Sequence, residues 1–314
     1  MQKAGSAMND RRERVERAIK SKKRAAFIVN TRSSQGAEYY REAKQKVVDS
    51  GFALDAADPV GEAQRLPDLV QQAIRRGHNL VIVGGGDGTI HSVAHLFAYA
   101  DVALGILPLG TANNYARQLG LPLNLAGAVD VLVSGKVSEV DMGQINGHCF
   151  VNGASVGLPA AIAKATARIM KSWFGRLAYA VVAAGRFIGY KPFAVRISTA
   201  NGARTFEALD IWIAKGGYEG GVLVAPEAKL DSGELTLSIL EGKSKWNLLK
   251  EWAKTALAFV FPPSEREVLH ADSFVMDASP KQDVSIDGDV LIQTSGIPSF
   301  FRRMRRSDLK KDVD

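Results

Sequence analysis

The chain has 314 residues, of which 46% are apolar and 23% charged, a composition that is ordinary for a globular protein and excludes wholesale disorder. At roughly 150 residues per domain, this length suggests two domains. The net charge of +7 favours polyanionic partners: nucleic acid, an anionic membrane surface or nucleotide phosphates. The single cysteine, Cys149, excludes an intramolecular disulfide, and its strand-type neighbours favour a buried structural role.

Residues 1–24 are rich in lysine and arginine and predict a basic N-terminal helix or tail. They contain no apolar segment of the kind that a secretory signal requires. The longest apolar run, Leu177–Ile188, is about a dozen residues long and contains Arg186, whereas a membrane span needs ~20 apolar residues. We therefore expect a cytoplasmic protein whose contact with the inner membrane face is peripheral.

Short apolar runs alternate with helix-type segments in the first part of the chain. The predicted strands are Ala25–Asn30, Asn79–Val83 and Val102–Leu107, and the predicted helices are Ala37–Ser50, Leu66–Arg76 and Ile90–Ala98. This alternation predicts a parallel, doubly wound α/β sheet, whose loops gather at the carboxyl ends of the strands. We assign this α/β domain to residues 25–138.

Strand-type segments dominate from about residue 137 onward. They are Val137–Met142, His148–Asn152, Phe193–Thr199, Ala208–Ile213, Gly233–Leu240, Ser273–Met276 and Asp283–Ile286, with turn signals such as Asn-Gly and Asp-Gly between several of them. The pattern predicts an all-β, sandwich-like second domain over residues 139–295. Helical inserts interrupt it at Pro159–Gly189 and Lys245–Phe261, and whether residues 296–308 return to the first domain stays open.

A glycine-rich loop, Gly84–Thr89, follows the second predicted strand of the α/β domain and precedes a helix. Glycines let a backbone approach a phosphate chain closely, and a helix N-terminus attracts its negative charge. Asp87 could hold Mg²⁺ or accept a proton, and Thr89 could bind a phosphate oxygen. The alternative is a tight turn with Thr89 as the N-cap. The loop lacks the Lys-Ser/Thr pair of a Walker A motif.

A second loop, Pro108–Asn113, repeats this strand–loop–helix arrangement at the next strand. Thr111 and Asn113 lie at the expected start of a helix, where they could be caps or ligand contacts. Two such loops from neighbouring strands would form one edge suited to a nucleotide.

Gly-Gly-Asp-Gly-Thr followed by Pro-x-Gly-Thr-x-Asn-x-x-Ala-Arg resembles the catalytic domain of diacylglycerol, sphingosine and ceramide kinases. The resemblance spans about residues 25–305 and implies an ATP- and Mg²⁺-dependent lipid kinase with a nucleotide-binding domain and a β-sandwich-like domain. Asn30–Gly36 resembles the first nucleotide loop of the family, with Thr31 where proline is usual. The nucleotide-binding residues implied are Asn30, Ser34, Gly85, Gly86, Asp87, Gly88, Thr89, Gly110, Thr111 and Asn113.

In the second domain, Gly220–Leu235 resembles the family stretch that binds a structural Mg²⁺ through backbone carbonyls and an aspartate. The matched positions are Lys229, Ser232 and Glu234. Ser232 replaces an aspartate, and Asp231 could serve in its place. The alternative is a hairpin turn with a solvated Asp231.

Asp287-Gly288-Asp289 resembles the family's Asp-Gly-Glu, near which an acidic residue acts as the general base. The resemblance therefore implies Asp287, Asp87 and Asp289 as catalytic candidates. An Asp-Gly pair is also a routine hairpin turn. After Thr89 the family often has a glutamate where this chain has Ser92, and this departure keeps open a lipid-binding regulator without catalysis.

Diacylglycerol is the acceptor that we expect, and the alternatives are a ceramide or sphingoid base and then NAD, since NAD kinases share the glycine loop. Lys164–Arg176, which mixes cations with large apolar residues, and Arg302–Arg306 favour contact with an anionic membrane. Nothing in the sequence matches a nucleic-acid-binding motif, so we expect no nucleic-acid partner. A homodimer stays open.

Overall fold

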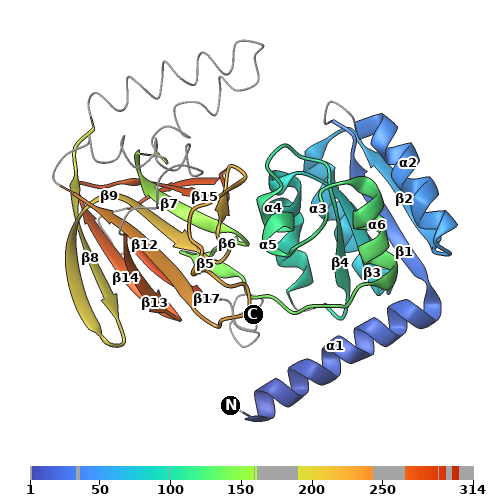
Figure 1. The fold of residues 1–314 in the computed structure, drawn as a ribbon, viewed down its shortest axis with the longest axis horizontal. Helices are drawn as coiled ribbons and strands as arrows, with labels where there is room; N and C mark the ends of the chain where they lie inside the picture. Colours follow the sequence, from blue (N-terminus) through green and yellow to red (C-terminus); the bar gives the residue numbers. More distant parts are fainter. Residues whose placement is uncertain are drawn as a thin grey trace. The chain divides into compact units, whose positions relative to one another are not determined.

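The computed structural model describes residues 2–32, 36–98, 100–158, 160, 190–242, 266–288, 290–294 and 299–303. These residues form two compact units. The first contains residues 2–140 together with Glu219–Gly221, and the second contains Asp141–Tyr218 and residues 222–303. Colours from blue to green mark most of the first unit in Figure 1, and green to red mark the second.

The first unit is built on a four-stranded sheet, whose parallel arrangement was predicted. Its strands are β1 (Arg24–Asn30), β2 (Ala53–Val60), β3 (Leu80–Gly85) and β4 (Ala103–Pro108), in the order β2-β1-β3-β4. Strand β2 lies at the edge of the sheet, where Pro59 is tolerated because an edge strand does not need every N–H for pairing.

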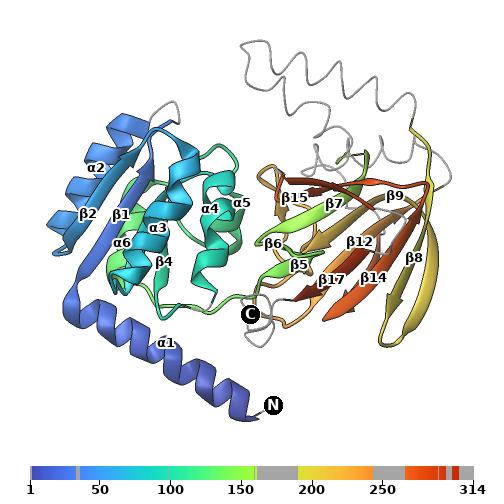
Figure 2. The ribbon, with the colours of Figure 1, turned by 180° about the vertical axis from the view of Figure 1, so that it is seen from behind.

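Helices cover both faces of this sheet. They are α1 (Gln2–Lys22), α2 (Gly36–Asp49), α3 (Leu66–Arg75), α4 (Asp87–Ala94), α5 (Asn114–Gln118) and α6 (Leu125–Ser134), with short 3-10 helices η1 (Ala63–Arg65) and η2 (His95–Phe97). Helices α2 and α6 lie on one face in Figure 1, and α3 and α4 lie on the other in Figure 2. Because both faces are covered, the consecutive residues Phe27 and Ile28 of β1 are both buried.

The second unit is an antiparallel sheet of eleven strands. They are β5 (Gly143–Ile145), β6 (His148–Phe150), β7 (Gly153–Gly157), β8 (Phe193–Thr199), β9 (Gly202–Ala214), β12 (Leu235–Glu241), β13 (Glu267–Ala271), β14 (Ser273–Ser279), β15 (Asp283–Ile286), β16 (Val290–Gln293) and β17 (Ser299–Arg303). A separate pair, β10 (Tyr218–Glu219) and β11 (Val222–Leu223), adjoins it in sequence.

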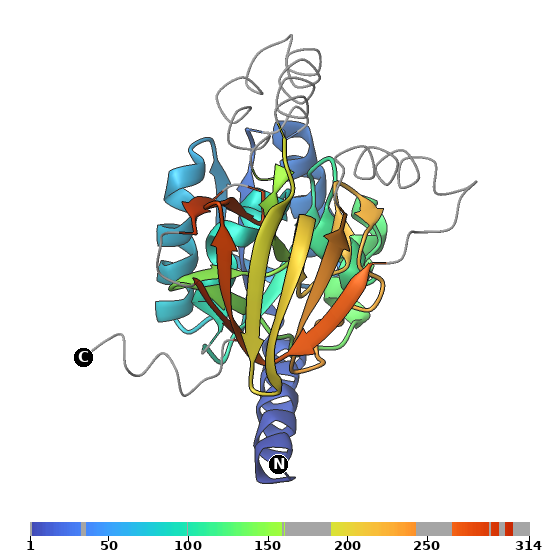
Figure 3. The same cartoon turned by 90° about the vertical axis from the view of Figure 1, so that its left-hand side faces the viewer.

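Strand β9 joins the two parts of this sheet. Its first half pairs with β8, and its second half pairs with β7 on one side and with β12 on the other. The strands enclose one apolar core, to which Phe150, Phe193, Ile211, Leu237 and Phe274 contribute. Figure 3 faces this sheet and shows its strands fanning across the unit. The predicted β-rich fold is therefore confirmed.

Two segments differ from expectation. The strand predicted at Val137–Met142 is wrong, because the backbone there bonds to other partners: Val137 N donates to Glu16 Oε2 (3.3 Å) and Asp141 N to Leu230 O (2.7 Å). Strand β17, at Ser299–Arg303, pairs with β14 and β5, so this part of residues 296–308 lies in the second unit.

Apart from residue 160, the predicted inserts at 159–189 and 245–261 lie outside the described residues, as do Lys164–Arg176 and residues 304–306. In the part of the chain that the structure describes, no helix has the length and apolar character needed to cross a bilayer.

Candidate functional site

The glycine-rich loop forms the end of β3 and the first turn of α4. Gly86 is the N-cap, with an extended backbone, and Asp87, Gly88 and Thr89 are the first helical residues. The helical ladder begins with the bond from Ile90 N to Gly86 O (3.1 Å), so the amides of residues 87–89 precede it. The alternative reading of Thr89 as the N-cap is therefore wrong, because the helix begins two residues before Thr89.

Glycine is required in this loop by close packing. A Cβ at Gly85 would lie 2.5 Å from the Thr89 side chain, inside any normal contact distance. Gly86 approaches Gly110 of the second loop so closely that a Cβ built on Gly110 would lie 2.5 Å from Gly86 Cα. The two loops are thus in direct backbone contact, at the carboxyl ends of neighbouring parallel strands.

Hydrogen bonds hold the two loops together. Leu109 N donates to Gly85 O (3.0 Å), and Tyr115 N donates to Asp87 Oδ1 (3.1 Å). Asp87 Oδ2 makes no hydrogen bond or ion pair with the described residues. Asp87 therefore joins the first loop to the start of α5, and it keeps an oxygen that can meet a cation.

The shape of the second loop depends on Asn113. This residue is buried and left-handed, with φ of 49°. Its Oδ1 accepts from Gly110 N (2.9 Å) and its Nδ2 donates to Gly110 O (2.8 Å). The alternative in which the Asn113 side chain caps the helix is not observed, because its amide oxygen and nitrogen both bond to Gly110. Thr111 lies exposed on the same loop.

Asn30, at the end of β1, connects a third loop to these two. Its Nδ2 donates to Thr89 Oγ1 (3.1 Å), and its Oδ1 accepts from Arg32 N (3.1 Å). The structure therefore brings together the nucleotide candidates from three adjacent strands. Ser34 lies outside the described residues.

A histidine with a shifted pKa, His95, directly follows helix α4. Burial, with a smaller contribution from nearby His91, lowers the pKa of His95 in η2. Its imidazole is therefore neutral at pH 7 and adds no positive charge there.

In the second unit, the carboxylate of Asp287 binds the backbone. Asp287 has φ of 46° in the turn after β15. Its Oδ2 accepts from Val151 N (2.8 Å), and its Oδ1 accepts from Asn152 N (3.0 Å) and Gly153 N (2.8 Å). The predicted hairpin turn is present, and the carboxylate anchors it to the start of β7. Asp289 lies outside the described residues.

The predicted Mg²⁺ loop contacts a buried lysine. Ser232 Oγ donates to Lys229 O (3.1 Å) and lies 3.2 Å from Glu234 O. The buried Lys215 donates through Nζ to Glu234 O (2.9 Å) and to Asp141 Oδ2 (3.0 Å). Asp231 is exposed. The structure brings the other three candidates together, but the Glu234 carbonyl is bound by an ammonium group, and this donor set does not fit a metal ion as it stands.

Five residues that contribute to these loops were not predicted from the sequence. The Tyr115 amide donates to Asp87, Arg117 Nε donates to Ala112 O (2.8 Å), and Asn114 Oδ1 accepts from Gly221 N (2.7 Å). The other two are Lys215 and Asp141, which form an ion pair. A lysine at the end of the apolar run 211–214 was the available signal for a buried ion pair.

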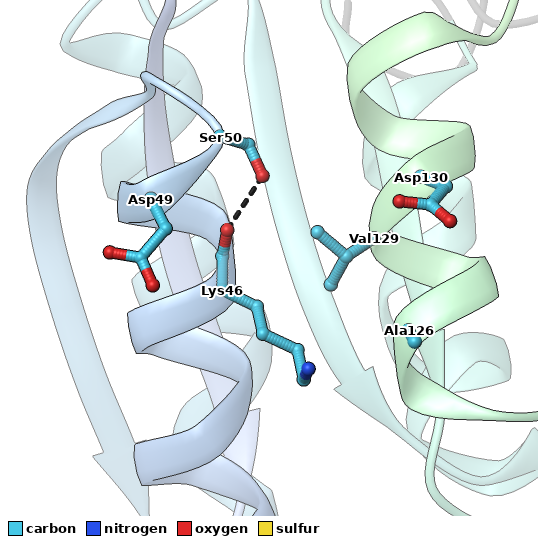
Figure 4. Close-up of a pocket in the computed structure, with 6 residues that line it drawn as sticks. All are labelled: Lys46, Asp49, Ser50, Ala126, Val129 and Asp130. Atoms are coloured by element: carbon cyan, nitrogen blue, oxygen red, sulfur yellow. Dashed lines mark hydrogen bonds between the residues drawn. The ribbon is translucent and has the colours of Figure 1, made fainter.

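A hollow of about 240 Å³ lies elsewhere in the first unit, between α2 and α6 (Figure 4). Its lining is Lys46, Asp49, Ser50, Ala126, Val129 and Asp130. Figure 4 shows the Lys46 side chain extending into the space between the two helices, with the Ser50 hydroxyl donating to the Lys46 carbonyl (2.6 Å). None of the lining residues belongs to the glycine loops, so we do not assign the nucleotide to this hollow.

Comparison with known proteins identifies both halves of the chain. Residues 24–145 match the model of the diacylglycerol kinase catalytic domain, and residues 152–298 match that of the YegS C-terminal NAD kinase beta sandwich-like domain. A diacylglycerol kinase structure from Bacillus anthracis str. Sterne superposes with a TM-score of 0.69 at 21% identity, covering 90% of this chain and 94% of that one, which shows a common fold.

Two relatives in bacteria carry the name "Probable lipid kinase YegS-like". The protein of Enterobacter sp. (strain 638) is 34% identical over 68% of this chain and 73% of its own length. That of Yersinia pestis (strain Pestoides F) is 31% identical over 87% of this chain and 89% of its own length. The chain therefore belongs to the YegS-like lipid kinases, which carry the diacylglycerol kinase catalytic domain.

Proposed function

We propose that this diacylglycerol-kinase-like enzyme transfers the γ-phosphoryl group of ATP to a lipid hydroxyl, with diacylglycerol as the acceptor. The observation that carries the proposal is the pair of glycine loops joined at Gly86 and Gly110, with Asp87 between them. Family membership supports a lipid as the substrate class.

The loop backbone provides the phosphate contacts in this proposal. Phosphoryl transfer depends mainly on positioning the phosphates and on offsetting their charge. The amides of residues 87–89, at the start of α4, present N–H groups and the positive end of the helix dipole. Gly85 and Gly110 allow the close packing of the loops, because a Cβ at either position would lie 2.5 Å from Thr89 or from Gly86.

Asp87 is the residue to which we assign Mg²⁺, because a carboxylate oxygen is the ligand that this ion prefers. When bound with ATP, the ion would offset the charge on the phosphates. Asp87 itself does two things: Oδ1 fixes the start of α5 through Tyr115 N, and Oδ2 would bind the ion.

We assign to Asp287 the role of the general base that accepts the proton of the lipid hydroxyl, as the family resemblance implies. Its three backbone bonds would hold the carboxylate in one orientation. The same bonds give it a structural task, so its catalytic and structural roles must be measured separately.

The test offers radiolabelled ATP with diacylglycerol, ceramide, sphingosine or NAD in parallel, with vesicle-dispersed lipids and Mg²⁺. Labelled phosphatidic acid is the expected product. Labelled ceramide phosphate or sphingosine phosphate would show that the acceptor is not diacylglycerol, while the proposal of a lipid kinase would stand. Labelled NADP would overturn the lipid proposal, and no product in any arm would favour a lipid-binding regulator.

A further inference from the structure

In the loop Lys229–Glu234, next to β12, the carbonyl groups of Lys229, Leu230 and Glu234 meet hydrogen-bond donors from within the chain. The Ser232 hydroxyl lies within hydrogen-bond distance of the carbonyls of Lys229 (3.1 Å) and Glu234 (3.2 Å). It also accepts from Glu234 N (3.3 Å). A hydroxyl carries a single proton, so it donates to one of these carbonyls at a time and leaves capacity for a second donor.

That second donor is Lys215. Its side chain has no exposed surface, and its Nζ donates to Glu234 O (2.9 Å) and Asp141 Oδ2 (3.0 Å). Asp141 Oδ2 also accepts from Gly233 N (2.9 Å), and Asp141 N donates to Leu230 O (2.7 Å). The ammonium therefore ties the end of β9, the start of the unit at Asp141 and the loop into one hydrogen-bonded cluster.

The oxygen atoms of the cluster are those of a cation site, and the cation they bind is the Lys215 ammonium, which is part of the chain. It offers a carboxylate and backbone carbonyls, which are hard oxygen donors suited to a small cation. Burying a charge requires a partner and hydrogen bonds, and Lys215 has both. In the part of the chain that the structure describes, no three His, Cys, Asp or Glu residues are grouped to hold a metal ion.

A divalent ion in addition to this ammonium is disfavoured on two grounds. It would stand within a few ångströms of a buried like charge, in surroundings that screen it poorly. It would also need about six oxygen ligands near 2.1 Å, while Asp141 Oδ2 and Glu234 O are already engaged by Lys215.

We propose that the Lys215 ammonium is the structural cation of the loop Lys229–Glu234, standing where the family resemblance implies a structural Mg²⁺. Lys215 and Ser232 then belong together: the lysine supplies the positive charge, and a serine in place of an aspartate keeps the cluster from gaining a second negative charge. The β-rich unit does not need a divalent ion for its stability, whatever the kinase requires for its nucleotide.

The first measurement is thermal melting of the full chain without nucleotide, in chelator and in millimolar MgCl₂. We expect the same melting temperature in both. An Mg²⁺-dependent rise that survives Asp87→Ala and is abolished by Asp141→Asn would overturn the proposal, since it would locate a divalent ion in the cluster.

The second measurement exchanges the cation. Lys215→Asn combined with Ser232→Asp removes the ammonium and restores a carboxylate, so its melting temperature should fall by roughly 10 °C in chelator and recover by several degrees in Mg²⁺. Lys215→Asn alone should fall without recovery. Lys281→Met removes an exposed ammonium of the same unit and should melt as the parent does.

A double variant that folds and ignores Mg²⁺ would show that the cluster is no cation site. If neither Lys215 variant folds, Lys215→Gln, which keeps a donor of similar length but no charge, replaces them. The proposal then requires a lower melting temperature for Lys215→Gln than for the Lys281→Met control, and equality would overturn it.

Discussion

One carboxylate oxygen of Asp87 accepts from Tyr115 N (3.1 Å) and so joins the first glycine loop to the start of α5. Replacing Asp87 with alanine removes both this bond and the proposed ligand of Mg²⁺. We expect kcat for lipid phosphorylation to fall by about 10²–10³-fold, the range for loss of a group that stabilises charge in the transition state. Steady-state kinetics with labelled ATP measure this, and unchanged turnover would remove Asp87 from the site.

Asp87→Asn separates the two roles, because an amide oxygen can still accept from Tyr115 N while the negative charge is lost. We expect its kcat to fall nearly as far as that of Asp87→Ala, with the parent's melting temperature retained. Full activity in Asp87→Asn would indicate that the carboxylate serves only to join the loops.

The contact between Gly86 and Gly110 leaves no space for a methyl group. In Gly110→Ala the new Cβ would lie 2.5 Å from Gly86 Cα, a backbone atom, so the loops must separate. We expect KM for ATP to rise by about tenfold or more, since overpacking of this kind costs about 1–3 kcal/mol. Gly61→Ala is the matched control, because nothing lies within 4 Å of its Cβ. Equal KM values for the two variants would contradict a tight loop junction.

Asp287 combines a proposed chemical role with a visible structural one. Asp287→Ala leaves the amides of Val151, Asn152 and Gly153 without their acceptor, and we expect a loss of about 2–4 kcal/mol of unfolding free energy. Denaturant unfolding monitored in the β-rich unit measures it. Asp283→Ala, at the start of β15, provides the comparison, and an Asp287→Ala variant as stable as Asp283→Ala would show that these three bonds do not stabilise the fold.

Among the helices, strands and loops, the sequence best predicts those that depend on residues adjacent in the chain. Both glycine loops follow buried apolar strands, so the pattern alone places them at one edge of a parallel sheet. It does not predict β2, because Asp55, Asp58 and Pro59 suppress the strand signal and an edge strand tolerates them. It wrongly predicts a strand at Val137–Met142, because the backbone there bonds to partners far away in sequence.

The cation cluster shows the same limit for a site. The resemblance predicts three positions of the loop, and the structure brings them together. Lys215 and Asp141 reach them from segments 14 or more residues away, and only the folded sheet places those segments side by side. No spacing rule in the sequence indicates such a contact.

Helix α1 is attached to the first unit partly by charge. Arg11 Nε donates to Asp101 Oδ1 (2.7 Å) and Arg14 to Oδ2 (2.9 Å), while Val15 and Ile19 pack into the core. The Arg11 hydrogen bond is the main cause that lowers the pKa of Asp101. The stabilisation from this pair is therefore complete above the unfolded pKa of about 3.9 and is lost as the pH falls through the lower folded value.

We accordingly expect the amides of α1 to lose protection from hydrogen exchange as the pH falls below about 4, before those of β1 and β3. The effect is small, because the Asp101 side chain is 50% exposed. Asp101→Asn should reproduce the loosening at pH 7, whereas Asp130→Asn, an exposed aspartate on α6, should not. If the amides of α1 were equally protected at pH 7 and pH 2.5, the apolar contacts alone would hold the helix.

Over the whole molecule, positive charge is concentrated in the first 24 residues. They contain nine lysines and arginines against three aspartates and glutamates, which accounts for six of the seven net positive charges. A lipid kinase must reach its substrate in a bilayer, and basic residues near an anionic surface each contribute about 1 kcal/mol of attraction. We therefore propose that the N-terminal segment attracts the enzyme to anionic membranes.

Co-sedimentation with vesicles tests this attraction. The full chain should bind vesicles containing anionic phospholipid in 50 mM salt and dissociate in 0.5 M salt, because screening shortens the reach of exposed charges to about 4 Å. Replacing Arg17 and Lys23, both exposed, with glutamate should weaken binding by about tenfold or more. The same reversal at Lys191 and Lys281 changes the net charge equally but lies in the β-rich unit, so it should weaken binding less. Equal losses in the two double variants would mean that net charge, and not the N-terminal segment, governs attraction to the membrane.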